Sequence, residues 1–150
     1  NTNFYELWGE WIYKDVKPRI LCEKFLKNIN ESSILDYKFY CFNGQPKFIH
    51  VDLDRIKNHE RNFYNLNWER LPFGLCYPQS ERDVPKPKRL KLMIELAKKL
   101  SSDFKFVRVD FYEVEHEVIF GELTFFPGNA LEIFFPNEYD KIFGDELNLN

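Results

Sequence analysis

Two acidic residues in the last third of the chain could form a metal site. Asp110 follows Arg108 by two positions, and Glu122 precedes Thr124 by two. Side chains two positions apart on a strand share one face, so each pair would point the same way. Carboxylate and hydroxyl oxygens suit Mg²⁺, which is usually completed by substrate phosphates. The planar fork of an arginine suits a phosphate or a developing anion.

A hairpin would bring these side chains together. Residues 104–125 alternate as two strands with a tight turn near Glu115 and His116, which sets Asp110 opposite or nearly opposite Glu122. Paired carboxylates repel each other, and a divalent cation would remove that cost. The hairpin alone is equally well explained by surface carboxylates that form an ion pair with the arginine on a solvated sheet face.

The remaining elements predict an α+β domain with an antiparallel sheet and flanking helices. Asn-Gly at 43–44 is a strong hairpin signal, and apolar residues spaced by three and four predict one helix with a single apolar face. The expected elements are a buried strand at 19–27, turn residues at 28–33, strands at 35–42 and 47–53, a partly irregular excursion at 54–88, a helix at 88–101 and an aromatic tail at 129–150.

Composition narrows the classes of function. The 150 residues suffice for one domain, and the net charge of −3 argues against a nucleic-acid binder. No apolar stretch is long enough to span a membrane, and no signal-peptide pattern is present. Three widely spaced cysteines form no metal-ligand cluster and indicate reduced thiols. We therefore expect a cytoplasmic protein.

The hairpin motif also resembles a known signature. Arg108-x-Asp110 followed by Glu122-x-Thr124-x-x-Pro127-Gly128 is similar to the R-x-D … E-x-N-x-x-P-G pattern of ATP-grasp enzymes such as D-alanine–D-alanine ligases. The runs DYKFYCFNGQPKF, FVRVDFY and FGELTFFPG resemble more closely the TupA-like ATP-grasp family. That family is associated with teichuronopeptide, capsule and other surface-polysaccharide biosynthesis, and its members are sometimes labelled glycosyltransferases. The resemblance covers roughly residues 4–147.

This resemblance implies roles for the hairpin residues. Asp110 and Glu122 would be magnesium ligands that bridge the phosphates of ATP, and Arg108 would be the catalytic cation that stabilises the transferred phosphoryl group or acyl-phosphate. Thr124 stands where the family usually has asparagine. A hydroxyl can still bind Mg²⁺ or hold a bound water, although it is a weaker ligand than an amide carbonyl.

The resemblance also implies a nucleotide-binding segment before the first hairpin. A hinge strand would hold adenine, and Asp36 would bind the ribose hydroxyls. Strand alternation puts Lys38 on the same face as Asp36, where it would either reach a phosphate or an acidic substrate or be solvated. The expected hinge residues are Glu23, Lys24, Phe25 and Leu26.

The implied reaction is an ATP-dependent carboxylate–amine ligation through an acyl-phosphate, with ATP and Mg²⁺ as cofactors. The substrate would be a small molecule or polysaccharide precursor, such as an amino acid or uronic acid. The chain begins with Asn1 and shows no glycine-rich phosphate lid. We therefore expect residues 1–150 to be the C-terminal nucleotide- and magnesium-binding domain of a longer protein, inactive alone. The sequence does not indicate an oligomeric state.

Two other functions remain open. Asp52-Leu53-Asp54 is a D-x-D, the pattern with which glycosyltransferases bind a metal and a sugar nucleotide, although so short a motif is common. Arg55 beside it would be placed to contact an acidic acceptor, although nothing in the local sequence requires that contact. Alternatively, the Thr124 substitution is compatible with a non-catalytic ATP-grasp-like module that binds a partner.

Overall fold

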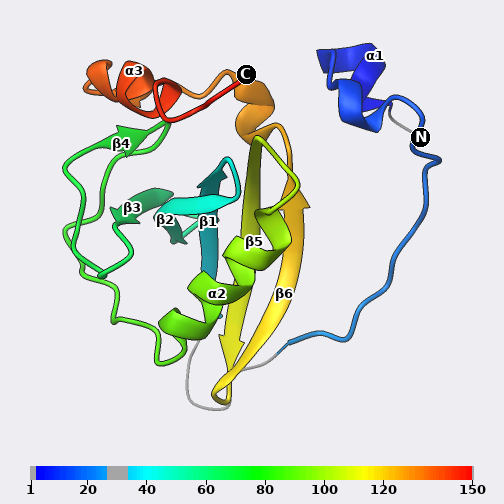
Figure 1. Cartoon of the computed structure of the whole chain (residues 1–150). Helices are drawn as coiled ribbons and strands as arrows, with labels where there is room; N and C mark the ends of the chain where they lie inside the picture. The colour runs from blue at the N-terminus through cyan, green and yellow to red at the C-terminus, as the bar shows by residue number, and fades with distance from the viewer. Residues whose placement is uncertain (1–2, 27–33, 150) are drawn as a thin grey trace.

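A computed structural model describes residues 3–26 and 34–149 of the chain. Its centre is a five-stranded antiparallel sheet with strand order β3-β2-β1-β5-β6 (Figure 1). The α+β expectation is therefore confirmed. The sheet strands are β1 (Asp36–Phe42), β2 (Gln45–Leu53), β3 (Glu60–Tyr64), β5 (Phe106–Val114) and β6 (Glu117–Thr124).

The first hairpin turns at Asn43-Gly44, as the sequence predicts. Both residues have positive φ, 48° and 73°, which the turn requires and glycine accommodates without strain. A Cβ on Gly44 would also lie 3.2 Å from the Cα of Ser102, so the turn packs closely against the end of the helix. The turn sets the pairing next to it, and a register shift between Tyr40 and Cys41 then sets the pairing of the rest of β1 with β2.

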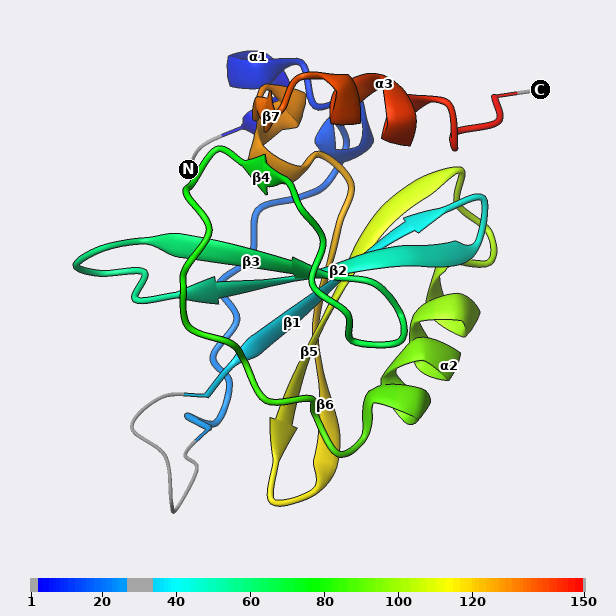
Figure 2. The ribbon, with the colours of Figure 1, turned by 90° about the vertical axis from the view of Figure 1, so that its left-hand side faces the viewer.

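Helix α2 (Leu90–Ser101) covers one face of the sheet (Figure 2). Leu90, Met93 and Ala97 pack into a core with alternate residues of the central strands, as the helical spacing predicts. Leu100 differs from the prediction, since it is 37% exposed while Ser101 is buried. The strand residues of this core are Tyr37, Phe39, Cys41, Ile49, Val51, Tyr64, Val107, Val109 and Phe111.

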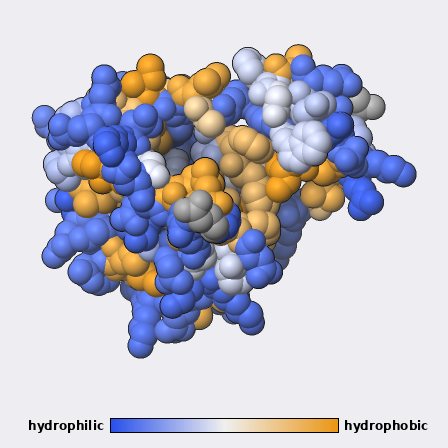
Figure 3. All heavy atoms as spheres, turned by 45° about the horizontal axis from the view of Figure 1, so that its top comes forward, coloured by the Kyte–Doolittle hydropathy of each residue, from blue (hydrophilic) through white to orange (hydrophobic). Residues whose placement is uncertain are grey.

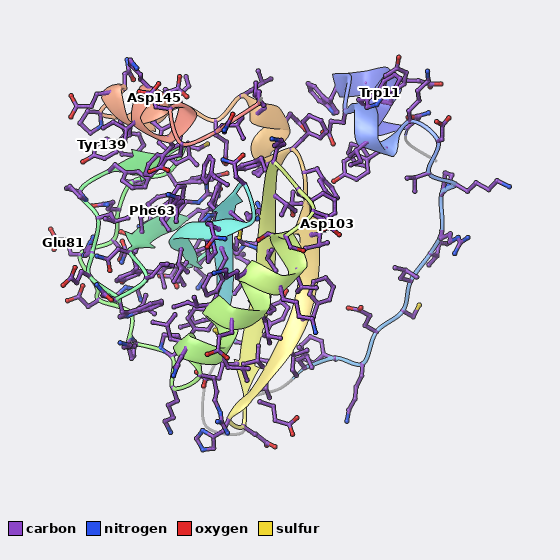
Figure 4. The ribbon with its side chains drawn as sticks, viewed as in Figure 1. Trp11, Phe63, Glu81, Asp103, Tyr139 and Asp145 are labelled. Atoms are coloured by element: carbon purple, nitrogen blue, oxygen red, sulfur yellow. The ribbon has the colours of Figure 1, made fainter. Side chains whose placement is uncertain are left out.

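The other face of the sheet is half aromatic and half charged. Its aromatic half packs beneath the C-terminal helix α3 (Glu138–Gly144) and a two-stranded sheet of β4 (Gly74–Leu75) and β7 (Phe134–Phe135). Phe63 of β3 and Tyr139 of α3 belong to this cluster (Figure 4). Its buried members are Tyr40, Phe42, Phe48, Phe63, Phe73 and Leu75. The excursion and the tail therefore contain elements that their sequences do not predict.

The second hairpin, β5 and β6, carries a bulge beside the predicted site. Glu115 and His116 form the turn with positive φ, as expected. Val109 pairs with Leu123, but the register shifts before Phe111. Asp110 consequently faces both Gly121 and Glu122. A Cβ on Gly121 would lie 3.1 Å from the carbonyl oxygen of Asp110, so a larger residue would crowd the bulge. Bulges re-aim side chains near functional sites.

The N-terminal arm differs most from expectation. It contains α1 (Phe4–Trp8) and a 3₁₀ turn, η1 (Trp11–Tyr13), and then runs without regular structure to residue 26. The predicted buried strand at 19–27 is wrong for its described part, because Ile20, Leu21 and Phe25 are 80–94% exposed. The predicted turn at 28–33 lies outside them.

The N-terminal arm contacts the rest of the molecule at the residues that directly follow β6. The hydroxyl of Tyr13 accepts a hydrogen bond from the backbone N–H of Phe125 at 3.4 Å, and its ring lies edge-on to Phe125 and Phe126. Apolar surface gathers where the arm meets the body (Figure 3). Leu131 and Ile133, which follow the 3₁₀ turn η2 (Pro127–Ala130), are also exposed.

Candidate functional site

The side chains expected from the hairpin motif converge on the charged half of the sheet face. Arg108 donates to both oxygens of Asp110, from Nε to Oδ1 at 2.8 Å and from Nη2 to Oδ2 at 2.7 Å. The same Nη2 lies 3.0 Å from Glu122 Oε1 and 3.0 Å from Thr124 Oγ1. Thr124 also donates to Glu122 at 3.0 Å. The period-2 prediction of a shared patch is therefore confirmed.

The first hairpin adds two residues to this patch. Lys38 lies directly opposite Asp110 on the neighbouring strand. Its ammonium donates to Asp110 Oδ2 at 2.6 Å and also to Asp36. Asp36 and Lys38 thus share a face, as the alternation predicts. We name this set of Asp36, Lys38, Arg108, Asp110, Glu122 and Thr124 the charged row.

The two carboxylates of the motif have different surroundings. The side chain of Asp110 is 1% exposed and that of Glu122 is 61% exposed. Burial alone would raise the pKa of Asp110, but hydrogen bonds and charge from Arg108 and Lys38 outweigh it and hold the pKa below its usual range. The ion pair with Arg108 is present, but Asp110 does not lie on a solvated face.

Asp36 is the least satisfied member of the charged row. Burial raises its pKa, although the Lys38 ammonium opposes that shift. Its Oδ1 is buried without a hydrogen-bond partner among the described residues, and the guanidinium of Arg55 lies 3.8 Å from Oδ2. An unpaired buried oxygen is costly, and such groups recur at functional sites.

The residues of the charged row could hold Mg²⁺ only together with phosphate oxygens from a bound substrate. In residues 3–26 and 34–149, no group of three or more His, Cys, Asp or Glu side chains is arranged to hold a metal ion. Mg²⁺ needs no such cage when one or two carboxylates act together with phosphate oxygens. Asp110, Glu122 and Thr124 supply that donor set, and Glu122 Oε2 accepts no hydrogen bond from the described residues. The chemistry therefore fits a phosphate-completed site.

A second charged cluster, which the sequence did not predict, adjoins the charged row. Arg61 of β3 donates to Asp52 at 2.8 Å and to Glu132 at 3.0 Å, and His59 lies 2.9 Å from Asp52. Burial alone would raise the pKa of Asp52, but hydrogen bonds and charge from its neighbours together outweigh burial and hold the pKa well below its usual range. Only the in-phase positions of His50 and Asp52 on β2 could have signalled this cluster.

Two uncharged groups lie between the clusters. His50, directly opposite Lys38, is 1% exposed, and burial lowers its pKa to about 3. Its Nε2 lies 3.1 Å from Asp52 Oδ2, but neither ring nitrogen has a hydrogen bond of good geometry. The Tyr40 hydroxyl is also buried without a partner among the described residues, and burial raises its pKa. This part of the sheet face thus contains buried polar atoms without a hydrogen-bond partner among the described residues.

The D-x-D residues are held apart by different partners. Asp52 is bound within the second cluster, whereas Asp54 follows β2 with positive φ and pairs with Arg82 at 2.6 Å. Each of the two carboxylates is thus bound by a different arginine.

The expected hinge residues are not joined to the charged row. Glu23, Lys24 and Phe25 are exposed, and Leu26 is half-buried. Among the described residues, none of the four makes a hydrogen bond or ion pair with Asp36. Their adenine-binding role stays a prediction.

The α+β fold, in which the strand with the R-x-D motif pairs with the strand with the E-x-T motif, is consistent with the ATP-grasp class of proteins. A family model described as TupA-like ATPgrasp matches residues 1–148, and the chain belongs to that family. Comparison with curated proteins and with solved structures gives no match. In the described part of the chain, no helix has the length and apolar character needed to cross a membrane.

Proposed function

We propose that this chain forms the magnesium- and nucleotide-binding part of an ATP-dependent carboxylate–amine ligase. One observation supports this proposal most strongly. Four side chains on one sheet face are joined by hydrogen bonds of 2.7–3.0 Å, and they are Arg108, Asp110, Glu122 and Thr124. Family membership supports an ATP- and Mg²⁺-dependent chemistry in general terms. The ligase assignment and the site roles are the proposal.

Each residue of the proposed site has a distinct task. Glu122 and Asp110 would hold Mg²⁺ against the ATP phosphates, with Thr124 as a weaker third ligand. When bound, the ion would neutralise phosphate charge and orient the leaving group. Arg108 already forms hydrogen bonds with both carboxylates, so it would exchange part of this pairing for contact with the transferred phosphoryl group. Lys38 would keep Asp110 ionised.

The proposed reaction has two steps. A substrate carboxylate oxygen attacks the γ-phosphorus of ATP, which breaks the bond to ADP and gives an acyl-phosphate. An amine then attacks the acyl carbon and expels inorganic phosphate, while a proton leaves the nitrogen. Arg108 would stabilise negative charge during the first step, since fixed cations act most strongly where charge develops.

The biological setting we propose is the synthesis of a cell-surface polysaccharide or teichuronopeptide, in which an amino acid or uronic acid is joined. This setting rests on the association of TupA-like ATP-grasp proteins with such pathways. No observation favours the glycosyltransferase alternative, because Asp52 and Asp54 are bound by separate partners. The binding-module alternative differs from ours because the ATP-grasp-like sheet would hold a partner and would not turn over ATP.

Calorimetric titration with ATP tests the proposal on a protein that contains this chain. We expect binding that needs Mg²⁺ and that is weakened in Glu122→Gln. Lys91→Gln on the exposed side of α2 is the matched control and should bind as the wild type does. Absence of binding at millimolar MgATP would refute the proposal. Release of ADP with an acid and an amine present would separate a ligase from a binding module.

A further inference from the structure

A pocket opens beside the charged row at the end of β2. Its volume is about 720 Å³, enough for a small organic molecule. Apolar side chains of Ile34, Leu35 and Leu53 form part of its wall, and Ile56 stands at its rim with 98% exposure. The pocket is therefore suited to a ligand with an apolar body.

The charged lining of this pocket is unequally compensated. Asp52 pairs with Arg61 at 2.8 Å, and Arg82 pairs with Asp54 at 2.6 Å and with Glu60 at 3.6 Å. Lys57 forms no ion pair with the described residues. Arg55 is the remaining lining cation, and its ion pair is long. Positive charge is thus left over in the pocket, and an anionic group would be attracted to it.

Arg55 connects the pocket to the proposed catalytic residues. Its side chain is 61% exposed, and its guanidinium lies 3.8 Å from Asp36 Oδ2. The same Asp36 oxygen accepts from Lys38, which also binds Asp110. An anion held by Arg55 would consequently lie next to the charged row rather than on a remote surface.

We propose that this pocket binds the carboxylate substrate of the ligase, with Arg55 and Lys57 as the residues that hold its carboxylate and the aliphatic wall as the contact for its body. The inference rests on the proposed function, because it supplies the acid that the first step would phosphorylate. A guanidinium binds a carboxylate through two parallel hydrogen bonds, which a neutral analogue cannot replace. The apolar wall favours an organic acid over inorganic phosphate.

Backbone amide NMR titrations of a protein that contains this chain test this pocket. We use hexanoate and D-glucuronate as acid probes, and hexanamide and D-glucose as their neutral counterparts. At least one of the two acids should shift the signals of residues 53–57. The acid that binds more tightly shows whether the pocket prefers an aliphatic acid or a sugar acid. The neutral probes should not shift these signals. Arg55→Gln should weaken acid binding roughly tenfold, the scale of one hydrogen bond to a charged group.

Further variants and ligands complete the test. Lys57→Gln should weaken binding of the acid in the same direction, whereas Lys91→Gln should leave it unchanged. Equal binding of hexanamide, equal binding of inorganic phosphate, or full acid binding by Arg55→Gln would overturn the pocket proposal. MgATP is titrated into the same samples. Loss of the acid response with intact MgATP binding refutes only the pocket, and the reverse result refutes only the nucleotide site.

Discussion

Lys38 of β1 and Asp110 of β5 lie directly opposite each other, and their Nζ and Oδ2 atoms are 2.6 Å apart. Both side chains are almost fully buried, with 6% and 1% exposure. This pair joins the two hairpins across the centre of the sheet. It also places a fixed cation against the carboxylate that we propose as a magnesium ligand.

Replacing Lys38 by methionine should destabilise the fold strongly. The change leaves the Asp36 and Asp110 carboxylates side by side in a buried position without the ammonium that both bind. Breaking a buried ion pair by removing one partner costs about 3–5 kcal/mol. Urea unfolding followed by circular dichroism measures the loss.

The matched control for that change is Lys47→Met. Lys47 pairs with Glu146 at 2.6 Å, but both side chains are well exposed. Exposed ion pairs contribute roughly 0–1 kcal/mol, so we expect a small change. Equal losses in the two variants would show that the buried pair does not support the fold in the way described.

Asp110→Asn and Glu122→Gln should separate stability from nucleotide binding. Asp110 is buried among cations, so Asp110→Asn should lower the free energy of unfolding by roughly 3 kcal/mol. Glu122 is exposed, so Glu122→Gln should change stability by less than about 1 kcal/mol.

Nucleotide binding should respond in both variants. Each substitution should weaken Mg²⁺-dependent ATP binding by about tenfold or more. A loss of about tenfold is the smallest typically seen when a residue that only positions a metal ligand is replaced. Calorimetry at constant Mg²⁺ measures this, with thermal unfolding recorded alongside. Normal MgATP affinity in a stable Glu122→Gln protein would contradict its assignment as a ligand.

Thr124 tests the departure from the usual family pattern. Its hydroxyl bonds to both Arg108 and Glu122 at 3.0 Å. Thr124→Asn restores an amide carbonyl, a stronger oxygen ligand, so the half-saturating Mg²⁺ concentration for ATP binding should fall or stay the same. Thr124→Val keeps the shape of the side chain but removes the oxygen, so this concentration should rise. The half-saturating Mg²⁺ concentration for ATP binding ranks the three proteins, and an unchanged value in Thr124→Val would show that the hydroxyl is not used.

His50 should make the fold sensitive to mild acid. Burial lowers its pKa from 6.5 to about 3, while Asp52 opposes and Arg61 adds to this shift. Between these values the unfolded chain binds a proton that the folded chain does not, so stability falls as pH decreases. The expected contribution is a loss of roughly 2 kcal/mol between pH 6.5 and pH 5.

Chemical unfolding at a series of pH values measures this effect. His50→Gln carries no titrating ring, so its stability should depend less on pH over the same interval, whatever its stability at pH 7. His116, an exposed turn residue, provides the control variant His116→Gln. A wild-type slope retained in His50→Gln would mean that another group governs the acid response.

The local pattern predicted much of the fold. Asn43-Gly44 predicts the first hairpin because its backbone must adopt positive φ, and helical spacing predicts α2 through Leu90, Met93 and Ala97. The excursion was less predictable. β3 is positioned there by backbone pairing with β2. In the tail, α3 packs on a mainly aromatic cluster whose members follow no clear sequence period.

The sequence by itself determined which residues share a strand face, because period-2 alternation is a property of the backbone. It thereby placed Arg108 with Asp110, and Asp36 with Lys38. Only the tertiary structure decided that β1 pairs with β5, that Asp110 is buried while Glu122 is exposed, and that residues 19–26 form no buried strand. Strand order and burial depend on contacts between distant segments, which no local spacing encodes.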